Sequence, residues 1–291
     1  AYGVIVTGSR TVLIGSQGGI ACSVCPGGVR VGSPVNPQLG AKVLVGGEDL
    51  DFALPGVLPV VWQRQYTSYV NAEYGASCGP LGYGWKLPQQ LRLELLDDAC
   101  LLHDAAGRVI TFEPLPAGQS IYSPSEDLWL LRGGPDAIWA AQARWTHVPA
   151  VVAANPELVL AAGGDGEVLW VFAPAPAPAP ISAPAAAPTW RLIAQLDRFG
   201  RSQRYEYAAE HTDGSGSPGE PPDIPQGHLV ALTDGVGRRY RLRHARIHAG
   251  KAAQGLWGAD DGWRLVAVEL QTDPLHPLSA AAPLTLVRYG Y

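Results

Sequence analysis

Short runs in which apolar and polar residues alternate recur along the chain. Residues 91–95, with the sequence LRLEL, are the clearest example. Because successive side chains of a strand point to opposite faces, this period of two predicts a strand with one buried face. We expect further strands at 60–66 and 109–112, and a hairpin that turns at 163–166 and continues through 168–172. The pattern indicates an all-β protein built from short antiparallel strands.

Proline-rich and polar segments interrupt these runs. Pro34 and Pro37 exclude a helix and mark a boundary between residues 33 and 34. Residues 173–189, rich in Ala and Pro, predict an exposed loop or linker of polyproline type. We expect a short helix within 132–157 and poor order in the polar insertion 212–226. These breaks divide the chain into a first segment, a plug region, a loop and a repeat region, at 1–33, 34–172, 173–189 and 190–291.

The composition agrees with a folded β-protein. Hydrophobic residues make up 47% and charged residues 16% of the 291, and 35 Gly and 26 Pro supply turns. The apolar runs are shorter than the roughly 20 residues that a membrane-spanning helix needs. The chain starts with Ala1 and contains no Met, so we expect it to be part of a longer protein, and its start has no signal-peptide pattern.

The charge pattern argues against a nucleic-acid partner. The formal net charge is −5, whereas phosphate binding requires clustered Lys and Arg. The one dense group is Arg238, Arg239, Arg241 and Arg243, and Asp234 lies close by. In a strand we expect these arginines to be divided between two faces.

A five-residue motif, Asp-x-x-Gly-Arg, occurs three times. Its members are Asp104, Gly107 and Arg108; Asp197, Gly200 and Arg201; and Asp234, Gly237 and Arg238. The Asp side chain can accept from the backbone N–H two residues on, Gly supplies a positive φ, and the Arg guanidinium can return to the carboxylate. The motif is also an ordinary turn sequence, but three copies with matching extended flanks favour a repeat. Each copy predicts one β-hairpin, and hairpins bury their faces only by stacking side by side.

Longer ordered motifs resemble the N-terminal region of bacterial Rhs proteins, and the Asp-x-x-Gly-Arg hairpins followed by Tyr-x-Tyr at 205–207 resemble their YD repeats. The N-terminal motifs lie at 21–28 (ACSVCPGG), 34–37 (PVNP), 39–44 (LGAKVL), 54–59 (LPGVLP), 64–69 (RQYTSY) and 79–85 (GPLGYGW). The resemblance runs from about Val6 to the end, with gaps at the Ala/Pro-rich stretch and the 212–226 insertion.

The resemblance implies a fold and a function. Rhs proteins are polymorphic toxins whose YD repeats spiral into a hollow cocoon around a C-terminal toxin. Many leave the bacterial cytoplasm by type VI secretion and enter competitor cells. Residues 1–33 resemble the tail of a PAAR-like segment that caps the VgrG spike, and residues 34–172 the plug and first shell strands. The implied partners are the rest of the shell, the toxin, VgrG, an Eag-type chaperone and an immunity protein; no cofactor is implied.

Two functions from other classes remain as alternatives. YD repeats also occur in surface proteins, so a carbohydrate-binding or adhesive β-protein is one of them, and rows of exposed Trp would favour it. A β-rich hydrolase is the other, and it would need two carboxylates in a cleft, about 5–10 Å apart.

Self-cleavage is the one reaction that we expect within this chain. By resemblance the cleaved bond is Ser33–Pro34. The candidate acids are Glu48, Asp49 and Asp51, since a carboxyl with a raised pKa can act as general acid and base. The competing interpretation makes them turn and sheet-edge residues.

Cysteines and histidines provide weaker candidates. Cys22 and Cys25 have the CxxC spacing of metal and redox sites, but no His or second CxxC accompanies them, which favours a structural thiol pair. No nucleophile motif accompanies His103, His244 and His248, so we interpret them as exposed sheet residues.

Overall fold

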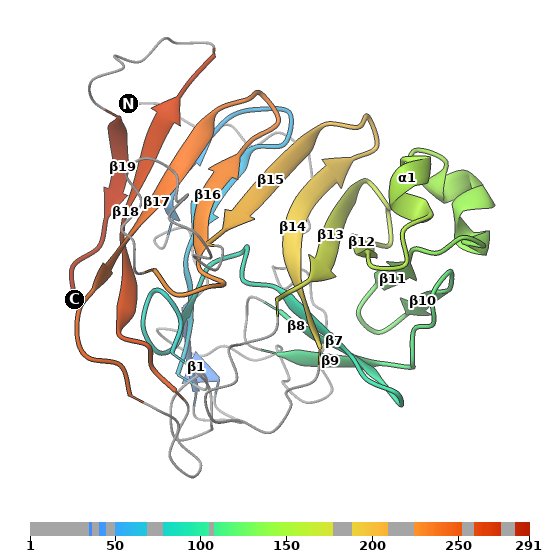
Figure 1. Cartoon of the computed structure of the whole chain (residues 1–291), viewed down its shortest axis with the longest axis horizontal. Helices are drawn as coiled ribbons and strands as arrows, with labels where there is room; N and C mark the ends of the chain where they lie inside the picture. Colours follow the sequence, from blue (N-terminus) through green and yellow to red (C-terminus); the bar gives the residue numbers. More distant parts are fainter. Residues whose placement is uncertain are drawn as a thin grey trace.

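A computed structural model describes residues 35–36, 41–44, 50–68, 78–104, 108–176, 188–208, 224–251, 259–274 and 283–291. Antiparallel strands dominate this part of the chain, and helix is confined to three single-turn pieces (Figure 1). The prediction of an all-β fold built from antiparallel hairpins is confirmed. No helix in the described segments is long and apolar enough to span a membrane.

The strands before residue 115 form two small sheets and one branch of a large sheet. They are β1 (Val35–Asn36), β2 (Ala41–Leu44), β3 (Leu50–Leu54), β4 (Val60–Gln63), β5 (Gln65–Thr67), β6 (Trp85–Lys86), β7 (Arg92–Leu95), β8 (Cys100–His103) and β9 (Val109–Phe112). The first sheet has the order β1-β2-β5-β6, and β3 pairs only with β4 in the second.

The remaining strands continue the large sheet. They are β10 (Ser120–Ser123), β11 (Leu128–Arg132), β12 (Val159–Gly163), β13 (Val168–Pro174), β14 (Thr189–Asp197), β15 (Ser202–Tyr207), β16 (Leu229–Thr233), β17 (Arg239–Arg246), β18 (Trp263–Thr272) and β19 (Leu284–Arg288). Within the described segments this sheet has 13 strands, and β10 to β19 pair in sequence order.

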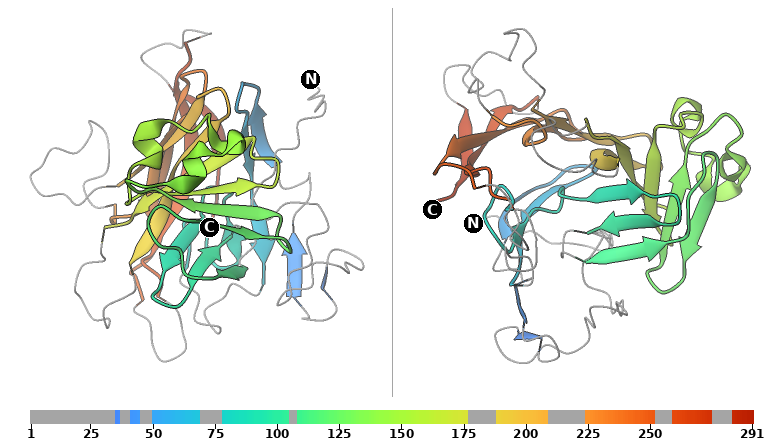
Figure 2. Two further views of the ribbon diagram at one scale, coloured as in Figure 1. Left: turned by 90° about the vertical axis from the view of Figure 1, so that its right-hand side faces the viewer. Right: turned by 60° about the horizontal axis from the view of Figure 1, so that its bottom comes forward.

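The large sheet forks at β14. One edge of β14 pairs with β13, while its other edge pairs first with β7 at residues 189–191 and then with β15 at residues 194–196. The β7-β8-β9 branch therefore leaves the main sheet and faces its inner side. Figure 2 shows the result, in which the main sheet curves over the β3–β4 hairpin and the branch lies opposite.

The expected single strand at 60–66 is wrong in one respect. It is divided at Arg64 into β4 and β5, which belong to different sheets. The guanidinium of Arg64 lies over the rings of Trp85 and Tyr289, with its carbon 4.8 and 5.2 Å from the two ring centroids. Because these rings come from distant elements, the local apolar pattern could not indicate the break.

The Trp- and Ala-rich segment contains short helices, as expected. They are the 3-10 helices η3 (Ile138–Ala141) and η4 (Ala143–Trp145) and the one-turn helix α1 (Ala150–Ala153). Their buried Trp139 and Trp145 pack on the outer face of the sheet with Leu160 and Val171. The sheet is covered on both faces here, which explains why β12 and β13 are almost continuously apolar.

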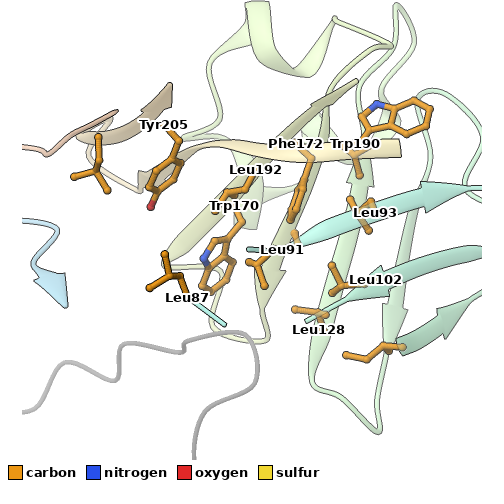
Figure 3. Close-up of a cluster of buried hydrophobic side chains, with 14 of the residues drawn as sticks. Leu87, Leu91, Leu93, Leu102, Leu128, Trp170, Phe172, Trp190, Leu192 and Tyr205 are labelled. Carbon is orange, nitrogen blue, oxygen red and sulfur yellow. The ribbon is translucent and has the colours of Figure 1, made fainter. Parts of the chain in front are cut away.

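The main core lies between the sheet and its branch. Figure 3 shows Trp170 and Phe172 of β13 facing Leu93 and Leu102 of β7 and β8. The same core extends to Trp62 of β4 on the β3–β4 hairpin. The hairpin is thus part of the interior, and its burial holds the early residues against the repeat strands.

The two rims of the sheet differ in their connections. Leu128 pairs with Gly163, and Val168 with Asp197, so the tight turns at 124–127, 164–167 and 198–201 lie at one rim. The 234–238 turn lies at the same rim, because Arg204 near the start of β15 pairs with Thr233 at the end of β16. The longer connections after β11, β13, β15 and β17 leave from the opposite rim. We call the first rim the tight-turn rim.

Candidate functional site: the Asp–Arg turns and the hairpin they hold

The repeated Asp and Arg residues adopt one geometry at all three positions. Each Asp Oδ1 accepts from the Arg backbone N–H, and each Oδ2 accepts from Arg Nε at 2.6 Å. Gly200 and Gly237 have φ of 77° and 86°, while Gly107 lies outside the described residues. In the second and third turns Oδ1 also accepts from the backbone N–H two residues on. The turn chemistry expected from the sequence is confirmed wherever it is described.

Charge-assisted hydrogen bonds stabilise the ionised carboxylates. Burial alone would raise the pKa of Asp197. Bonds from the side chain and backbone of Arg201, and from the backbone N–H of Phe199, outweigh that effect, and the pKa lies below its usual value. Asp104 and Asp234 have fully buried side chains, so their Arg partners compensate charges that water cannot reach.

The outer guanidinium nitrogens of two turns bind groups from other elements. Arg108 Nη1 donates to Glu126 of the β10–β11 turn at 3.3 Å. Arg238 Nη2 donates to the backbone oxygen of Pro55, between β3 and β4, at 2.7 Å. Arg201 makes no such contact within the described part of the chain, and its side chain is 40% exposed, against 13% for Arg108 and 6% for Arg238.

The 55–59 turn of the β3–β4 hairpin lies against the 234–238 turn. A Cβ on Gly56 would lie 3.2 Å from Arg238 Nη2, so this position favours glycine. The neighbouring strand adds a second anchor, because Gln203 Nε2 donates to the backbone oxygens of Leu58 and Pro59 at 2.9 and 3.1 Å. Repeat residues therefore hold the hairpin by its backbone carbonyls.

The open end of the hairpin is fixed to the last strands. Asp51 Oδ2 accepts from Arg64 Nε at 2.8 Å and from the Tyr289 hydroxyl at 2.7 Å. Trp62 Nε1 donates to the same hydroxyl at 2.9 Å. Burial, together with the bond to Asp51, raises the pKa of Tyr289. Asp51 therefore joins an early strand to residues more than 200 positions later.

The structure describes only one of the candidate cleavage residues. Asp51 is in the network just described, whereas Ser33, Pro34, Glu48 and Asp49 lie outside the described residues. Cys22 and Cys25 lie outside them too, and within the described segments no three His, Cys, Asp or Glu side chains gather as a metal site. The cleavage and CxxC hypotheses stay predictions.

A fourth Asp–Arg pair was missed in the sequence. Arg264 donates to both carboxylate oxygens of Asp260, at 3.0 and 2.7 Å. Burial would raise the pKa of Asp260, but hydrogen bonds from Arg264 and the backbone of Gly262 lower it to about 2. The Asp-to-Arg spacing equals that of the repeat, and only the glycine has moved, from the fourth to the third place. A search for Asp and Arg four apart, near a glycine, would have found it.

Two of the three histidines are less exposed than expected. His248 is exposed and His103 is half-buried beside Glu94, with Nε2 3.0 Å from the carboxylate. The interpretation of His244 as exposed is wrong, because its residue is 6% exposed and its ring lies 5.1 Å from that of His228. Burial and the neighbouring His228 lower the pKa of His244 to about 3.

The arginine group is divided between two faces, as expected, because Arg238 is buried at the 234–238 turn. Tyr240, Leu242 and His244 of β17 point inward, so Arg239, Arg241 and Arg243 share the other face. Two of these arginines face carboxylates, since Arg239 pairs with Glu206 and Arg243 with Glu269. Carboxylates on β15 and β18 thus balance part of the row, which removes the case for a phosphate-binding stripe.

Comparisons of the sequence with known proteins find one family model and relatives that are toxins. A family model described as "Domain of unknown function (DUF6531)" matches residues 32–112. Toxin protein Tse5 of Pseudomonas aeruginosa is 34% identical over 298 residues, which cover 99% of this chain and 20% of that protein. Double-stranded DNA deaminase toxin A of Burkholderia cenocepacia is 35% identical over 101 residues, 35% of this chain and 7% of that protein. The chain therefore spans at most a fifth of these relatives.

Two solved structures show weaker likeness. The TcdB2-TccC3-Cdc42 crystal structure matches 84% of this chain and 14% of its own, with a TM-score of 0.42 and 11% identity. The match to the N-terminal domain of the effector SpvB from Salmonella typhimurium covers 82% of this chain and 85% of that domain's chain, with a TM-score of 0.32 and 14% identity. Neither score is high enough to assign the fold.

The repeated Asp–Arg hairpins and their antiparallel sheet define a YD-repeat β-protein. With the nearly full-length match to a toxin, the chain belongs to the Rhs/YD-repeat polymorphic toxin family.

Because the two Asp–Arg pairs differ in burial, we expect Arg→Ala to lower the free energy of unfolding by different amounts in two copies of the turn. Arg238→Ala leaves the buried Asp234 carboxylate uncompensated, and we expect the free energy of unfolding to fall by about 3–5 kcal/mol. Arg201→Ala affects a partly exposed pair, and we expect a loss of at most about 1 kcal/mol in the 291-residue chain. Urea denaturation at pH 7 measures both losses. Equal losses would show that burial does not set the strength of the turn.

The buried His244 predicts an acid-sensitive stability. Its folded pKa lies below its unfolded value, so the stabilisation is complete above the ordinary histidine pKa of 6.5 and is lost as the pH falls toward about 3. Between pH 6 and 4 its share of the unfolding free energy should fall by about 1.4 kcal/mol per pH unit. We expect His244→Phe to reduce the measured slope by that amount in urea denaturation. The exposed-residue control His248→Gln should keep the slope, and an unchanged slope in His244→Phe would contradict the assignment.

Proposed function

We propose that the chain is the N-terminal part of a shell that encloses a C-terminal toxin and carries it, by type VI secretion, from the bacterial cytoplasm into competitor cells. The observation that carries the proposal is the 34% identity to a toxin over 99% of the chain but only 20% of that protein. Such a ratio is expected when this region is one part of a much larger carrier.

The geometry supports containment as the mechanism. Ten strands pair in sequence order, and the sheet they form curves over the β3–β4 hairpin (Figure 2). Sheets of this kind extend by adding hairpins, because each new strand pairs with the preceding one. In the proposed arrangement residues 34–172 act as plug and first shell strands and 190–291 as the first YD repeats. The expected loop at 173–189 is shorter at both ends, because β13 runs to Pro174 and β14 begins at Thr189.

The further partners follow from the same proposal. Residues 1–33 would be the tail of a PAAR-like segment that meets the VgrG spike. An Eag-type chaperone and an immunity protein would act before export. The adhesive alternative gains no support, since the described Trp residues are buried or half-buried and form no exposed row.

Protection from protease tests containment. In the full-length parent protein we expect the toxin segment to resist digestion at least tenfold longer than the same toxin segment expressed alone. Gel and mass-spectrometric time courses measure the two rates. A shell-opening control is the parent with Arg238→Ala, in which the buried Asp–Arg turn is broken and protection should fall. Equal digestion of enclosed and free toxin would refute the proposal.

We also propose that the parent hydrolyses its Ser33–Pro34 bond, with a carboxyl among Glu48, Asp49 and Asp51 as general acid and base. Water would supply the hydroxyl of the new Ser33 carboxyl and the proton of the new Pro34 amine. Intact-mass spectrometry of the purified parent should show two pieces that divide there. Cleavage should be lost, leaving the single mass of the uncut parent, in one of three variants: Glu48→Gln, Asp49→Asn or Asp51→Asn. The control Asp165→Asn, at an exposed turn, should still be cleaved. An uncut wild-type parent would remove the proposal.

A further inference from the structure

One of the Asp–Arg turns lacks the external contact that the others make. The outer nitrogens of Arg108 and Arg238 reach Glu126 and the Pro55 carbonyl. In the fourth pair, Arg264 Nη2 lies 3.3 Å from Nε2 of His248. Within the described segments, Arg201 contacts nothing beyond its own turn.

The same turn exposes an aromatic ring that its own geometry does not need. Phe199 is 68% exposed, and its ring lies between two guanidinium groups, with the carbons of Arg198 and Arg201 5.0 and 4.7 Å from the ring centroid. Asp197 and Gly200 already satisfy the turn by hydrogen bonds and a positive φ. These hydrogen bonds and the positive φ form the turn without requiring a phenylalanine at this position.

The 234–238 turn, the next along the tight-turn rim, shows the role of the position of Phe199 when another segment lies against the turn. Val236 corresponds to Phe199, is half-buried, and lies at the 55–59 turn, where a Cβ on Gly56 would be 3.8 Å from it. In that turn the Val236 side chain and the Arg238 guanidinium both lie against the backbone of the 55–59 turn. Among the described residues, a Cβ added at Gly200 would meet nothing within 4 Å, so no described segment covers this side of the 197–201 turn.

We propose that the 197–201 turn docks a further segment of the same longer polypeptide, which presents a carboxylate or carbonyl oxygen to Arg201 and an apolar side chain to Phe199. The inference rests on the proposed shell function, since it requires the rest of that chain. The turns of Arg108 and Arg238 each bind an oxygen acceptor from elsewhere in their own polypeptide. The chain spans only 20% of its toxin relative, so most of such a polypeptide lies outside it.

The charge of the turn specifies the incoming segment. Arg198 has one distant carboxylate, Glu167 at 3.8 Å, and both side chains are largely exposed. Arg201 shares one carboxylate with its own turn. Two guanidinium groups beside one ring therefore favour an acidic segment with an apolar residue, as in the Glu126 contact of Arg108.

Photocrosslinking in the full-length parent tests the docking. Benzoylphenylalanine replaces Phe199, and illumination followed by peptide mass spectrometry identifies its neighbour. We expect an intramolecular cross-link to a segment outside these 291 residues. The same probe at Ile138, which is 70% exposed in η3 near the opposite rim, is the matched control and should give at least tenfold less of that product. No intramolecular product at position 199, or a product only with a second protein or a second copy, would overturn the proposal.

A charge variant tests the role of Arg201. Arg201→Gln in the probe-bearing parent should lower the cross-link yield severalfold, whereas Arg239→Gln, an exposed arginine paired with Glu206, should not. An equal yield in both would overturn the role of the guanidinium. The protease assay separates the two proposals, because a protected toxin without the cross-link rejects the docking alone, and an unprotected toxin rejects the shell.

Discussion

The bidentate pairing of Asp with the Arg four residues later is the interaction on which the rest of the structure depends. Each pair closes a hairpin with one side chain and one backbone bond to the same carboxylate. At Asp104 and Asp234 the carboxylate is fully buried, so the guanidinium is required for the turn to exist in that place. A chain of such turns can continue indefinitely, because each hairpin offers its outer strand to the next.

The same guanidinium also connects the repeat to what lies inside it. Arg238 uses Nε for Asp234 and Nη2 for the Pro55 carbonyl, so forming the turn orients a donor toward the β3–β4 hairpin. At the other end of that hairpin Asp51 and Trp62 meet Tyr289. The early hairpin is therefore fixed at both ends by residues of the repeat region.

The sequence predicted what local chemistry determines. Asp, Gly and Arg at fixed spacing specify a turn whatever surrounds it, and the alternation at 91–95 corresponds to β7. Long-range contacts determine what the sequence did not show. The division at Arg64 depends on the rings of Trp85 and Tyr289, the fork at β14 on β7, and the burial of His244 on a neighbouring His228. The Asp260–Arg264 pair is also local, but its glycine stands in the third place, so the Asp-x-x-Gly-Arg pattern does not include it.

The difference between copies of one turn follows from their surroundings. Asp, Gly and Arg are constant because they make the hairpin, so variation falls on the two residues between Asp and Gly. The second of these is Phe199 in one turn and Val236 in the next. The side chain of that residue makes none of the hydrogen bonds that close the turn, so its identity can match the segment that lies against the turn. A repeat protein can thus keep one folding unit while each turn selects its own neighbour, and the exposed ring of Phe199 has the character expected of a turn whose neighbour lies elsewhere in the longer chain.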